Sequence, residues 1–270
     1  MGELIWGGPL FAVLRMLARC IYRWFASLFF DPLRLARQWR ALPYFLRNSI
    51  KWRRLCKGER FRFFWRESLF CSADRFASAG TAHGHYFWQD LWAAETLYGE
   101  GVRAHIDVGS RLDGFIAHLL PFCHVTYVDI RPLDIVHPHF EFRRGSILSL
   151  PFPDGSLLSL SCLHVIEHIG LGRYGDPIDP DGYRKAAGEL IRVLAPSGHL
   201  LIGTPVGRER LCFDAHRVFD PETITKAFLP LCLESFHLID DRGEQIQFDA
   251  AFDLARGCEY GCGLFRFRHQ

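Results

Sequence analysis

The stretch AHIDVGSRLDGFIAHLLPFCHVTYVDIR, residues 104–131, decides the fold class of this chain. The apolar run 106–108 predicts a short strand, and the Gly109–Ser110 turn after it lets a ligand approach the backbone closely. Apolar residues then recur at helical spacing over 112–120, and the β-branched run 125–128 predicts a second strand. This order of strand, glycine turn, helix and strand is typical of one half of a nucleotide-binding α/β sheet.

An acidic residue, Asp129, ends the second predicted strand about 20 residues after Gly109, where a carboxylate can accept hydrogen bonds from a ribose diol. Arg111 and Asp113 depart from this pattern, because dinucleotide-binding loops normally carry glycine or small residues at their places. On these residues alone, a generic buried strand and turn is as good an interpretation as a nucleotide site.

Length and composition indicate a folded chain. It has 270 residues, of which 49% are hydrophobic, enough for one large domain with an appendage. The nine cysteines are an odd number without paired spacing, which favours reduced thiols in the cytoplasm over a disulfide framework. Cys258 and Cys262 have no second pair in the sequence, so we expect no zinc site there.

Charge divides the chain into two parts. Residues 1–66 hold 14 Arg or Lys against three acids, about +11, which leaves about −9 for the remainder. We therefore expect a basic, amphipathic helical region over 1–66 and an α/β domain over 67–270. Many large apolar residues accompany the basic ones, which favours an anionic membrane surface over nucleic acid as the partner of the first region.

Residues 4–30 are apolar and aromatic, with Arg15, Arg19 and Arg23 along one helical face. A spanning helix would bury these charges at high cost, and a signal peptide would not carry arginines inside its apolar segment. We expect an in-plane amphipathic helix that gives peripheral contact with the inner membrane face. A helix that docks on the main domain or on a second subunit, as in a homo-oligomer, stays the alternative.

The rest of the chain continues the alternation of strands and helices. The patterns predict strands at 140–143, 157–163 and 199–203, a helix at 182–194, and two further strands at 233–239 and 263–268. Such alternation predicts a mostly parallel sheet with helices on both faces.

Several segments together resemble the class I S-adenosylmethionine-dependent methyltransferases. They are HIDVGS at 105–110, YVDI at 127–130, LPFPDGS at 150–156, HVIEHI at 164–169 and ELIRVLAPSGHLLIGTP at 189–205. Within that superfamily, GHYFWQDLWAAE, GSRLDGF, HIGLGRYGDPIDPDG and FDAHRVFDPETI are similar to an uncharacterised bacterial branch with a domain-of-unknown-function label. The resemblance covers roughly residues 30–270 and implies a Rossmann-like, seven-stranded sheet whose last strand is antiparallel.

The resemblance also implies that S-adenosylmethionine binds across the ends of the first, second and fourth strands. The residues that it assigns to the cofactor are Asp107, Gly109 and Ser110 on the methionine side, Asp129 at the ribose, Ser146 and Ile147 at the adenine, and Ile130 and His164 nearby. At its place, Ser146 is a weaker partner for the adenine amine than the acid that is often found there.

Methyl transfer is an in-line displacement, so the protein mainly aligns the reactants and excludes water, with a base where the acceptor is a hydroxyl. We expect that base near the ends of the fourth and fifth strands. His168 is our first choice and His216 our second, with Glu167 and His164 as further candidates. Alternatively, Glu167 and His168 only brace the loop by hydrogen bonds to the backbone.

The segment HVIEH also matches H-x-x-E-H, the pattern of inverted zinc peptidases. Here it closes a buried strand, and Gly170 and Gly172 interrupt any helix, so the two histidines need not share a face. A divalent ion that assists an O-methyltransferase suits the motif slightly better, because some quinone methyltransferases carry a similar cluster. We expect no metal.

The segment GRYGDPIDPDG, residues 172–182, is rich in turn residues and lies on the substrate side of the predicted sheet. We assign acceptor binding to Arg173, Tyr174, Asp176, His216 and Arg217, and expect Arg208, Arg210 and Arg217 to meet an acidic acceptor such as a sugar phosphate. The alternative is that the aspartates only start turns and cap the next helix.

These observations predict a cytoplasmic S-adenosylmethionine-dependent methyltransferase that acts on a hydroxyl of a glycan or a lipid-linked sugar. One alternative is a small-molecule or quinone methyltransferase. Another is a non-catalytic S-adenosylmethionine-binding protein whose N-terminal region recruits partners or membrane. Nucleic acid is not expected as a partner.

Overall fold

The computed structural model describes residues 39–58, 60–70, 75–76, 80 and 82–269. They belong to two compact units, Met1–Thr81 and Ala82–Gln270, whereas the charge pattern placed the division after residue 66. The predicted helix over 4–30 lies outside the described residues. Within the described ranges, no helix combines the length and the apolar character needed to cross a membrane.

In the first unit the main described element is the helix α3 (Leu42–Leu55), with a proline in its first turn and Arg53 and Arg54 in its last. A short 3₁₀ turn, η1 (Trp65–Glu67), follows it. Proline fits the first turn because the amide hydrogen that it lacks would have no helical partner there, and the late arginines complement the helix dipole.

The second unit is built on one sheet with the strand order β3-β2-β1-β4-β5-β10-β8-β9. Its first five strands are parallel, while β10 pairs antiparallel with both β5 and β8. The strands are β1 (Ala104–Val108), β2 (His124–Asp129), β3 (Phe140–Arg144), β4 (Leu157–Leu163), β5 (Leu194–Val206), β8 (Cys232–Ile239), β9 (Ile246–Gln247) and β10 (Gly261–Arg268). This confirms the predicted sheet and its antiparallel last strand; β9 is a two-residue addition at the edge.

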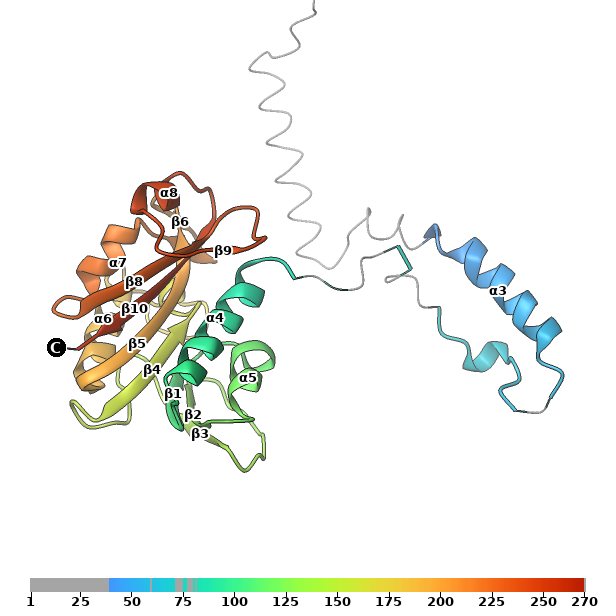
Figure 1. Cartoon of the computed structure of the whole chain (residues 1–270), viewed down its shortest axis with the longest axis horizontal. Coiled ribbons are helices and arrows are strands. Elements are labelled where there is room, and N and C mark those ends of the chain that lie inside the picture. Colours follow the sequence, from blue (N-terminus) through green and yellow to red (C-terminus); the bar gives the residue numbers. More distant parts are fainter. Residues whose placement is uncertain (1–38, 59, 71–74, 77–79, 81, 270) are drawn as a thin grey trace, which may run out of the picture. The chain divides into compact units, whose positions relative to one another are not determined.

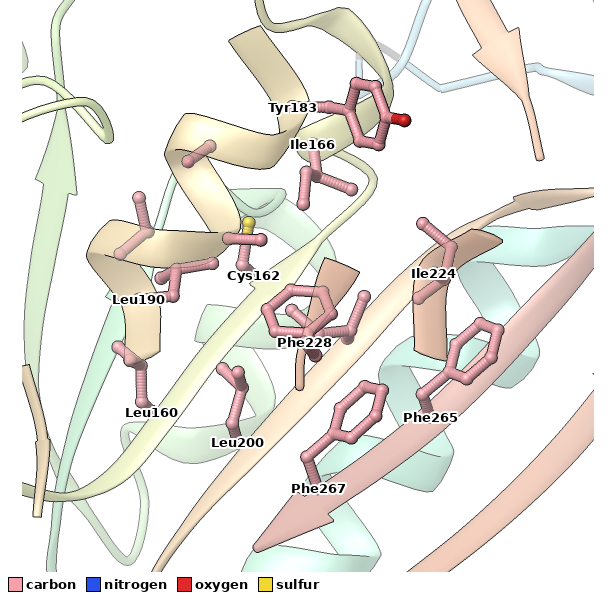
Figure 2. Close-up of a cluster of buried hydrophobic side chains, with 14 of the residues drawn as sticks. Leu160, Cys162, Ile166, Tyr183, Leu190, Leu200, Ile224, Phe228, Phe265 and Phe267 are labelled. Atoms are coloured by element: carbon pink, nitrogen blue, oxygen red, sulfur yellow. The ribbon is translucent and has the colours of Figure 1, made fainter. Parts of the chain in front are cut away.

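Helices cover both faces of this sheet (Figure 1). On one face lie α4 (His85–Gly99), the π-helical turn η2 (Leu112–Ile116) and α5 (Ala117–Leu119), which bury Trp92, Phe115 and Leu119 against β1 and β2. The other face carries α6 (Gly182–Val193), α7 (Pro221–Ala227) and α8 (Phe252–Arg256). In this second layer Phe228 packs on Phe267, and Leu190 lies near Cys162 (Figure 2).

Two predicted elements differ in detail from the structure. The fifth strand runs over Leu194–Val206 rather than 199–203, and it includes residues 196–198, which lie between the predicted helix and strand and where Ser197 has a φ of +63°. The predicted helix over 112–120 begins as a π-helical turn, which apolar spacing cannot distinguish from an α-helical one.

Two small elements complete the second unit beside the ends of β4 and β5. The 3₁₀ turn η3 (Ile166–His168) follows β4 directly. The hairpin of β6 (Arg210–Cys212) and β7 (His216–Val218) follows β5. Residues from both elements therefore reach the same end of the sheet.

Candidate active site

A cavity of about 570 Å³ lies beyond the carboxyl ends of β1, β2 and β4. This is where an open parallel sheet normally binds ligands, because the strand order reverses beside β1. Its lining comes from the turn after β1, from the ends of β2 and β3, and from residues 164–177. The lining residues used below are Gly109, Asp129, Ile130, Arg131, Ser146, Ile147, His164, His168, Tyr174 and Asp176.

The turn after β1 brings the backbone close to this cavity. Gly109 has a φ of +72°, and a Cβ at this residue would lie 3.1 Å from the side chain of Val165. Glycine is therefore required both by the left-handed backbone and by the packing of the loop after β4.

Asp107 and Ser110, which the resemblance assigns to the cofactor, are buried beneath the turn and do not line the cavity. The Asp107 carboxylate accepts hydrogen bonds from the Ser110 amide (2.9 Å), from the Ser110 hydroxyl (2.6 Å) and from the Ser161 hydroxyl. Burial raises the pKa of Asp107 to about 7. The carboxyl group thus holds the turn in shape from below.

Asp129 lines the cavity at the end of β2, but its carboxylate is occupied. Arg131 forms a two-pronged ion pair with it, and the Tyr127 hydroxyl donates to it at 3.1 Å. Burial opposes ionisation, but the hydrogen bonds from Arg131 outweigh it and lower the pKa of Asp129. A ribose diol would therefore have to share this carboxylate with Arg131 or displace it.

Ile130, Ser146 and Ile147 line the part of the cavity between β2 and β3. The Ser146 hydroxyl accepts a hydrogen bond from the Leu148 amide at 3.2 Å, which leaves its proton available to a ligand. The side chains of Ile130 and Ile147 offer apolar surface here, which suits an aromatic base.

Arg111 and Asp113, the two departures in the glycine loop, pair with each other. The Arg111 Nη2 lies 2.9 Å from Asp113 Oδ2, both side chains are exposed, and neither residue lines the cavity. Arg111 also lies over the ring of Tyr86, 5.1 Å from its centre. The two side chains therefore do not fill the space above Gly109.

His164 and Glu167 form a buried pair at the end of β4. His164 Nδ1 lies 2.8 Å from Glu167 Oε1, and the Thr204 hydroxyl donates to the other carboxylate oxygen at 3.3 Å. Burial would lower the pKa of His164, but Cys262 and Glu167 beside it raise this pKa well above its ordinary value. His164 lines the cavity, while Glu167 lies behind it.

His168 lines the cavity with one nitrogen committed to the backbone. Its Nδ1 donates to the Ala215 carbonyl at 2.7 Å, so Nε2 is the nitrogen that can take up a proton. Glu167 Oε1 lies 3.8 Å from that Nε2, and the ring of Tyr174 packs against the imidazole edge at 5.7 Å. This is the arrangement that a general base requires.

Residues 174–177 of the segment after η3 line the cavity, and polar residues in and near this segment mostly hold the loop together. The Asp176 carboxylate accepts from the Gly170 amide at 2.6 Å. Arg173 donates to the Ala215 carbonyl at 2.8 Å, and Arg217 to that of Ile169 at 2.7 Å. Of the residues predicted to bind the acceptor, Tyr174 and Asp176 line the cavity, whereas Arg173 and Arg217 do not.

His216 lies outside the cavity. Its ring packs 5.0 Å from that of Tyr260, and burial lowers its pKa. Arg210 donates to the carbonyls of Arg208 and Glu259, so it is engaged with the backbone.

A second cavity of about 510 Å³ shares His164 with the first. Its lining includes His83, His85, Tyr86, Asp240, Asp241 and Tyr260. The two cavities therefore meet at the histidine that follows β4.

Two family models match the second unit. Residues 106–202 match a model described as a methyltransferase domain, and the matched segment runs from β1 into β5, through the elements that build the first cavity. Over these residues the chain is similar to the S-adenosylmethionine-dependent methyltransferases. Residues 157–253 also match a model described as a Caenorhabditis protein of unknown function, DUF268. A search of curated protein sequences gives no match.

Solved structures share the fold of this methyltransferase domain. The [4+2]-cyclase SpnF is 13% identical, with a TM-score of 0.50 over 67% of this chain and 79% of that one. The N-methyltransferase NodS from Bradyrhizobium japonicum WM9, in complex with S-adenosyl-L-homocysteine, is 19% identical. Its TM-score is 0.46, over 67% of this chain and 85% of that one. At these identities the likeness concerns the fold.

S-adenosylmethionine is the cofactor of this class, and the first cavity of the methyltransferase domain suits it. The cavity is large enough for a nucleoside, and it combines a bare turn at Gly109, a carboxylate at Asp129 and an apolar wall at Ile147. We infer that Gly109, Asp129, Ile130, Ser146 and Ile147 hold the cofactor directly, and that Asp107 and Ser110 support the turn.

Arg131, His85 and Cys262 are site residues that the sequence did not predict. Arg131 stands two residues after the predicted acid, a spacing that suits an ion pair across the end of a strand. His85 and Cys262 are distant in the sequence and carry no local motif, so only the fold brings them to His164.

Proposed function

We propose that the methyltransferase domain transfers a methyl group from S-adenosylmethionine to a hydroxyl of a glycan or a lipid-linked sugar. The observation that carries the proposal is the position of His168, which lines the cofactor cavity while its Nδ1 is held by the Ala215 carbonyl, so that Nε2 is left to take up a proton. A hydroxyl is a poor nucleophile until it loses its proton, and an oriented imidazole is suited to accept that proton.

The chain's own residues then have separate tasks. The Ala215 carbonyl fixes the tautomer of His168, and the Glu167 carboxylate, 3.8 Å from Nε2, stabilises the imidazolium that forms. Tyr174 packs on the imidazole and excludes water from it. The cofactor supplies an electrophilic methyl group when bound.

The class of acceptor is inferred from the surroundings of the cavities. The second cavity is lined by two aromatic residues, Tyr86 and Tyr260, and by two acidic ones, Asp240 and Asp241. Aromatic faces beside hydrogen-bonding groups suit a sugar.

The lipid-linked alternative among these acceptors is supported by the first unit. On α3 the side chains of Trp52 and Leu55 are 51% and 69% exposed beside Arg53 and Arg54. Exposed aromatic and aliphatic side chains among arginines favour an anionic membrane surface. We propose peripheral membrane contact on this basis, and expect co-sedimentation with anionic vesicles to fall as salt rises; salt-independent sedimentation would contradict it.

Calorimetry with S-adenosylmethionine and its demethylated product tests the cofactor part of the proposal. We expect both to bind the full chain with one site. If folded protein binds neither, the methyltransferase proposal fails. The acceptor part is tested by transfer of labelled methyl to glycans, lipid-linked sugars and quinols. Transfer to quinols alone would overturn the sugar assignment, and cofactor binding without transfer to any acceptor would favour a non-catalytic protein.

A further inference from the structure

Three side chains that are distant in the sequence bring donor atoms together beside the cofactor cavity. His85 comes from the first turn of α4, His164 from the end of β4 and Cys262 from β10, and one donor atom from each lies within 4.8 Å of the others. We propose that these three residues bind one divalent ion of the zinc class. The proposal goes beyond methyl transfer, since a metal site needs neither cofactor nor acceptor.

The orientation of His164 fits a metal ligand. Because a carboxylate only accepts hydrogen bonds, the 2.8 Å contact with Glu167 places a proton on Nδ1 of His164, so Nε2 is the nitrogen that a metal ion would bind in place of a second proton. That Nε2 is buried and has no hydrogen-bond partner among the described residues. A histidine held through its other nitrogen by a carboxylate is the usual arrangement around protein-bound zinc.

His85 is oriented in the same way. Its Nε2 lies 3.0 Å from the Tyr260 carbonyl, which can only accept, so Nε2 carries the proton and Nδ1 keeps its lone pair. The ring stacks on that of His164, with centres 5.4 Å apart and planes 12° apart. Each imidazole therefore has one nitrogen fixed by the protein and one lone pair available.

Cys262 supplies the ligand that selects the metal. Its side chain is fully buried and free of any disulfide; it interacts with His164 and makes long contacts with Gln89 Oε1 at 3.8 Å and the Gly263 carbonyl at 3.9 Å. Two imidazoles and one thiolate favour zinc or its close relatives over magnesium or calcium, which prefer oxygen ligands.

Ion binding requires only a small closure of the three side chains. With Zn–N of about 2.0 Å and Zn–S of about 2.3 Å, tetrahedral donors stand roughly 3.3–3.7 Å apart, so the donors approach by about an ångström. His85, which is only partly buried at the start of its helix, has room for this movement.

The proposed site would keep one position open. Zinc is four-coordinate in most protein sites, and three protein ligands leave the fourth position for water or for an oxygen of a bound molecule. Both His85 and His164 line the second cavity, so the open position would face the space that we assign to the acceptor.

The experiment uses the untagged full-length chain, stripped with a chelator and titrated with Co²⁺ as a spectroscopic substitute for zinc. We expect one ion per chain, a thiolate-to-cobalt charge-transfer band, and displacement of Co²⁺ by Zn²⁺. The variants His85→Ala and Cys262→Ser should each lose the band and weaken zinc binding at least tenfold, with folding checked by circular dichroism.

Matched controls separate the site from general thiol and imidazole binding. Cys258→Ser removes another buried cysteine of the same segment, and His83→Ala removes a histidine two positions from His85; both should bind like the parent chain. Glu167→Gln should weaken binding by roughly 10–100-fold, because it loosens the hold on His164. Absence of stoichiometric Co²⁺ or Zn²⁺ binding, or equal binding by the Cys262→Ser and Cys258→Ser variants, would overturn the proposal.

Discussion

The guanidinium of Arg131 is paired with the carboxylate of Asp129, with Nη2 2.6 Å from Oδ2 and Nε 3.0 Å from Oδ1. The acid that we assign to the ribose is therefore already neutralised before any ligand arrives. Arg131 is 57% exposed, whereas Asp129 is 9% exposed, so the arginine is the partner that is free to move.

Two variants separate the roles of these residues in cofactor binding. Asp129→Ala should weaken S-adenosylmethionine binding by roughly 10–100-fold, since hydrogen bonds to a charged group are worth about 1.5–3 kcal/mol. Arg131→Ala should leave the affinity unchanged or raise it by up to about fivefold, because an exposed ion pair is worth at most about 1 kcal/mol. Calorimetry measures both. Unchanged affinity in Asp129→Ala would remove the ribose assignment.

His168→Gln tests the proposed base. Loss of a general base typically costs 10²–10⁴-fold in rate, so we expect kcat to fall by about that factor for a hydroxyl acceptor, with cofactor affinity unchanged. Removal of the titrating imidazole should also flatten the dependence of kcat on pH. His118→Gln, at an exposed position of α5, serves as the control. A larger loss in His216→Gln than in His168→Gln would assign the base to His216 instead.

A buried histidine makes the stability of the fold depend on pH. The Ser161 hydroxyl donates its hydrogen bond to Asp107, so His105 donates to the Ser161 oxygen at 2.8 Å and accepts a hydrogen bond from the Ser159 hydroxyl at 2.7 Å. Burial lowers the pKa of His105 from 6.5 to about 3. Below pH 6.5 the unfolded chain therefore binds a proton at His105 that the folded chain does not bind. The contribution of His105 to the free energy of unfolding is present above pH 6.5 and is lost as the pH falls towards 3.

Chemical denaturation at pH 6.5 and pH 5 measures this effect. At about 1.4 kcal/mol per pH unit, His105 should account for about 2 kcal/mol of the loss over this interval. The His105→Gln side chain can still donate and accept hydrogen bonds but does not titrate. Its free energy of unfolding should therefore fall by about 2 kcal/mol less than that of the parent over this interval. Parallel profiles for the two proteins would contradict the prediction.

Two glycines of the loop after β4, of which Gly175 lines the cavity, offer a matched test of packing. Gly170 and Gly175 have nearly the same φ, +84° and +86°, but a Cβ on Gly170 would overlap the Asp179 carbonyl, whereas one on Gly175 meets nothing within 4 Å. Gly175→Ala should cost about 1–2 kcal/mol from the left-handed backbone alone. Gly170→Ala adds overlap with the backbone, about 1–3 kcal/mol more. Equal free energies of unfolding for the two variants would show that the backbone around Asp179 moves to accommodate the added methyl group.

Much of the fold follows from local patterns in the sequence. The strand 157–163 is predicted to the residue, because the short, mostly apolar run LLSLSCL follows a Pro-Asp-Gly turn, as is typical of a buried parallel strand. The register of β5 across Ser197, by contrast, depends on pairing with β4 and β10, which periodicity does not encode.

The sequence by itself determined the class of domain and several residues that line the cavity. Motifs such as HIDVGS and HVIEHI are short, so their side chains lie close together whatever the rest of the chain does. Only the tertiary structure placed Asp107 beneath the loop, engaged Arg217 with backbone carbonyls, and brought His85 and Cys262 to His164. These relationships depend on hydrogen bonding and close packing between segments that are distant in the chain, such as His85 and Tyr260, which are 175 positions apart.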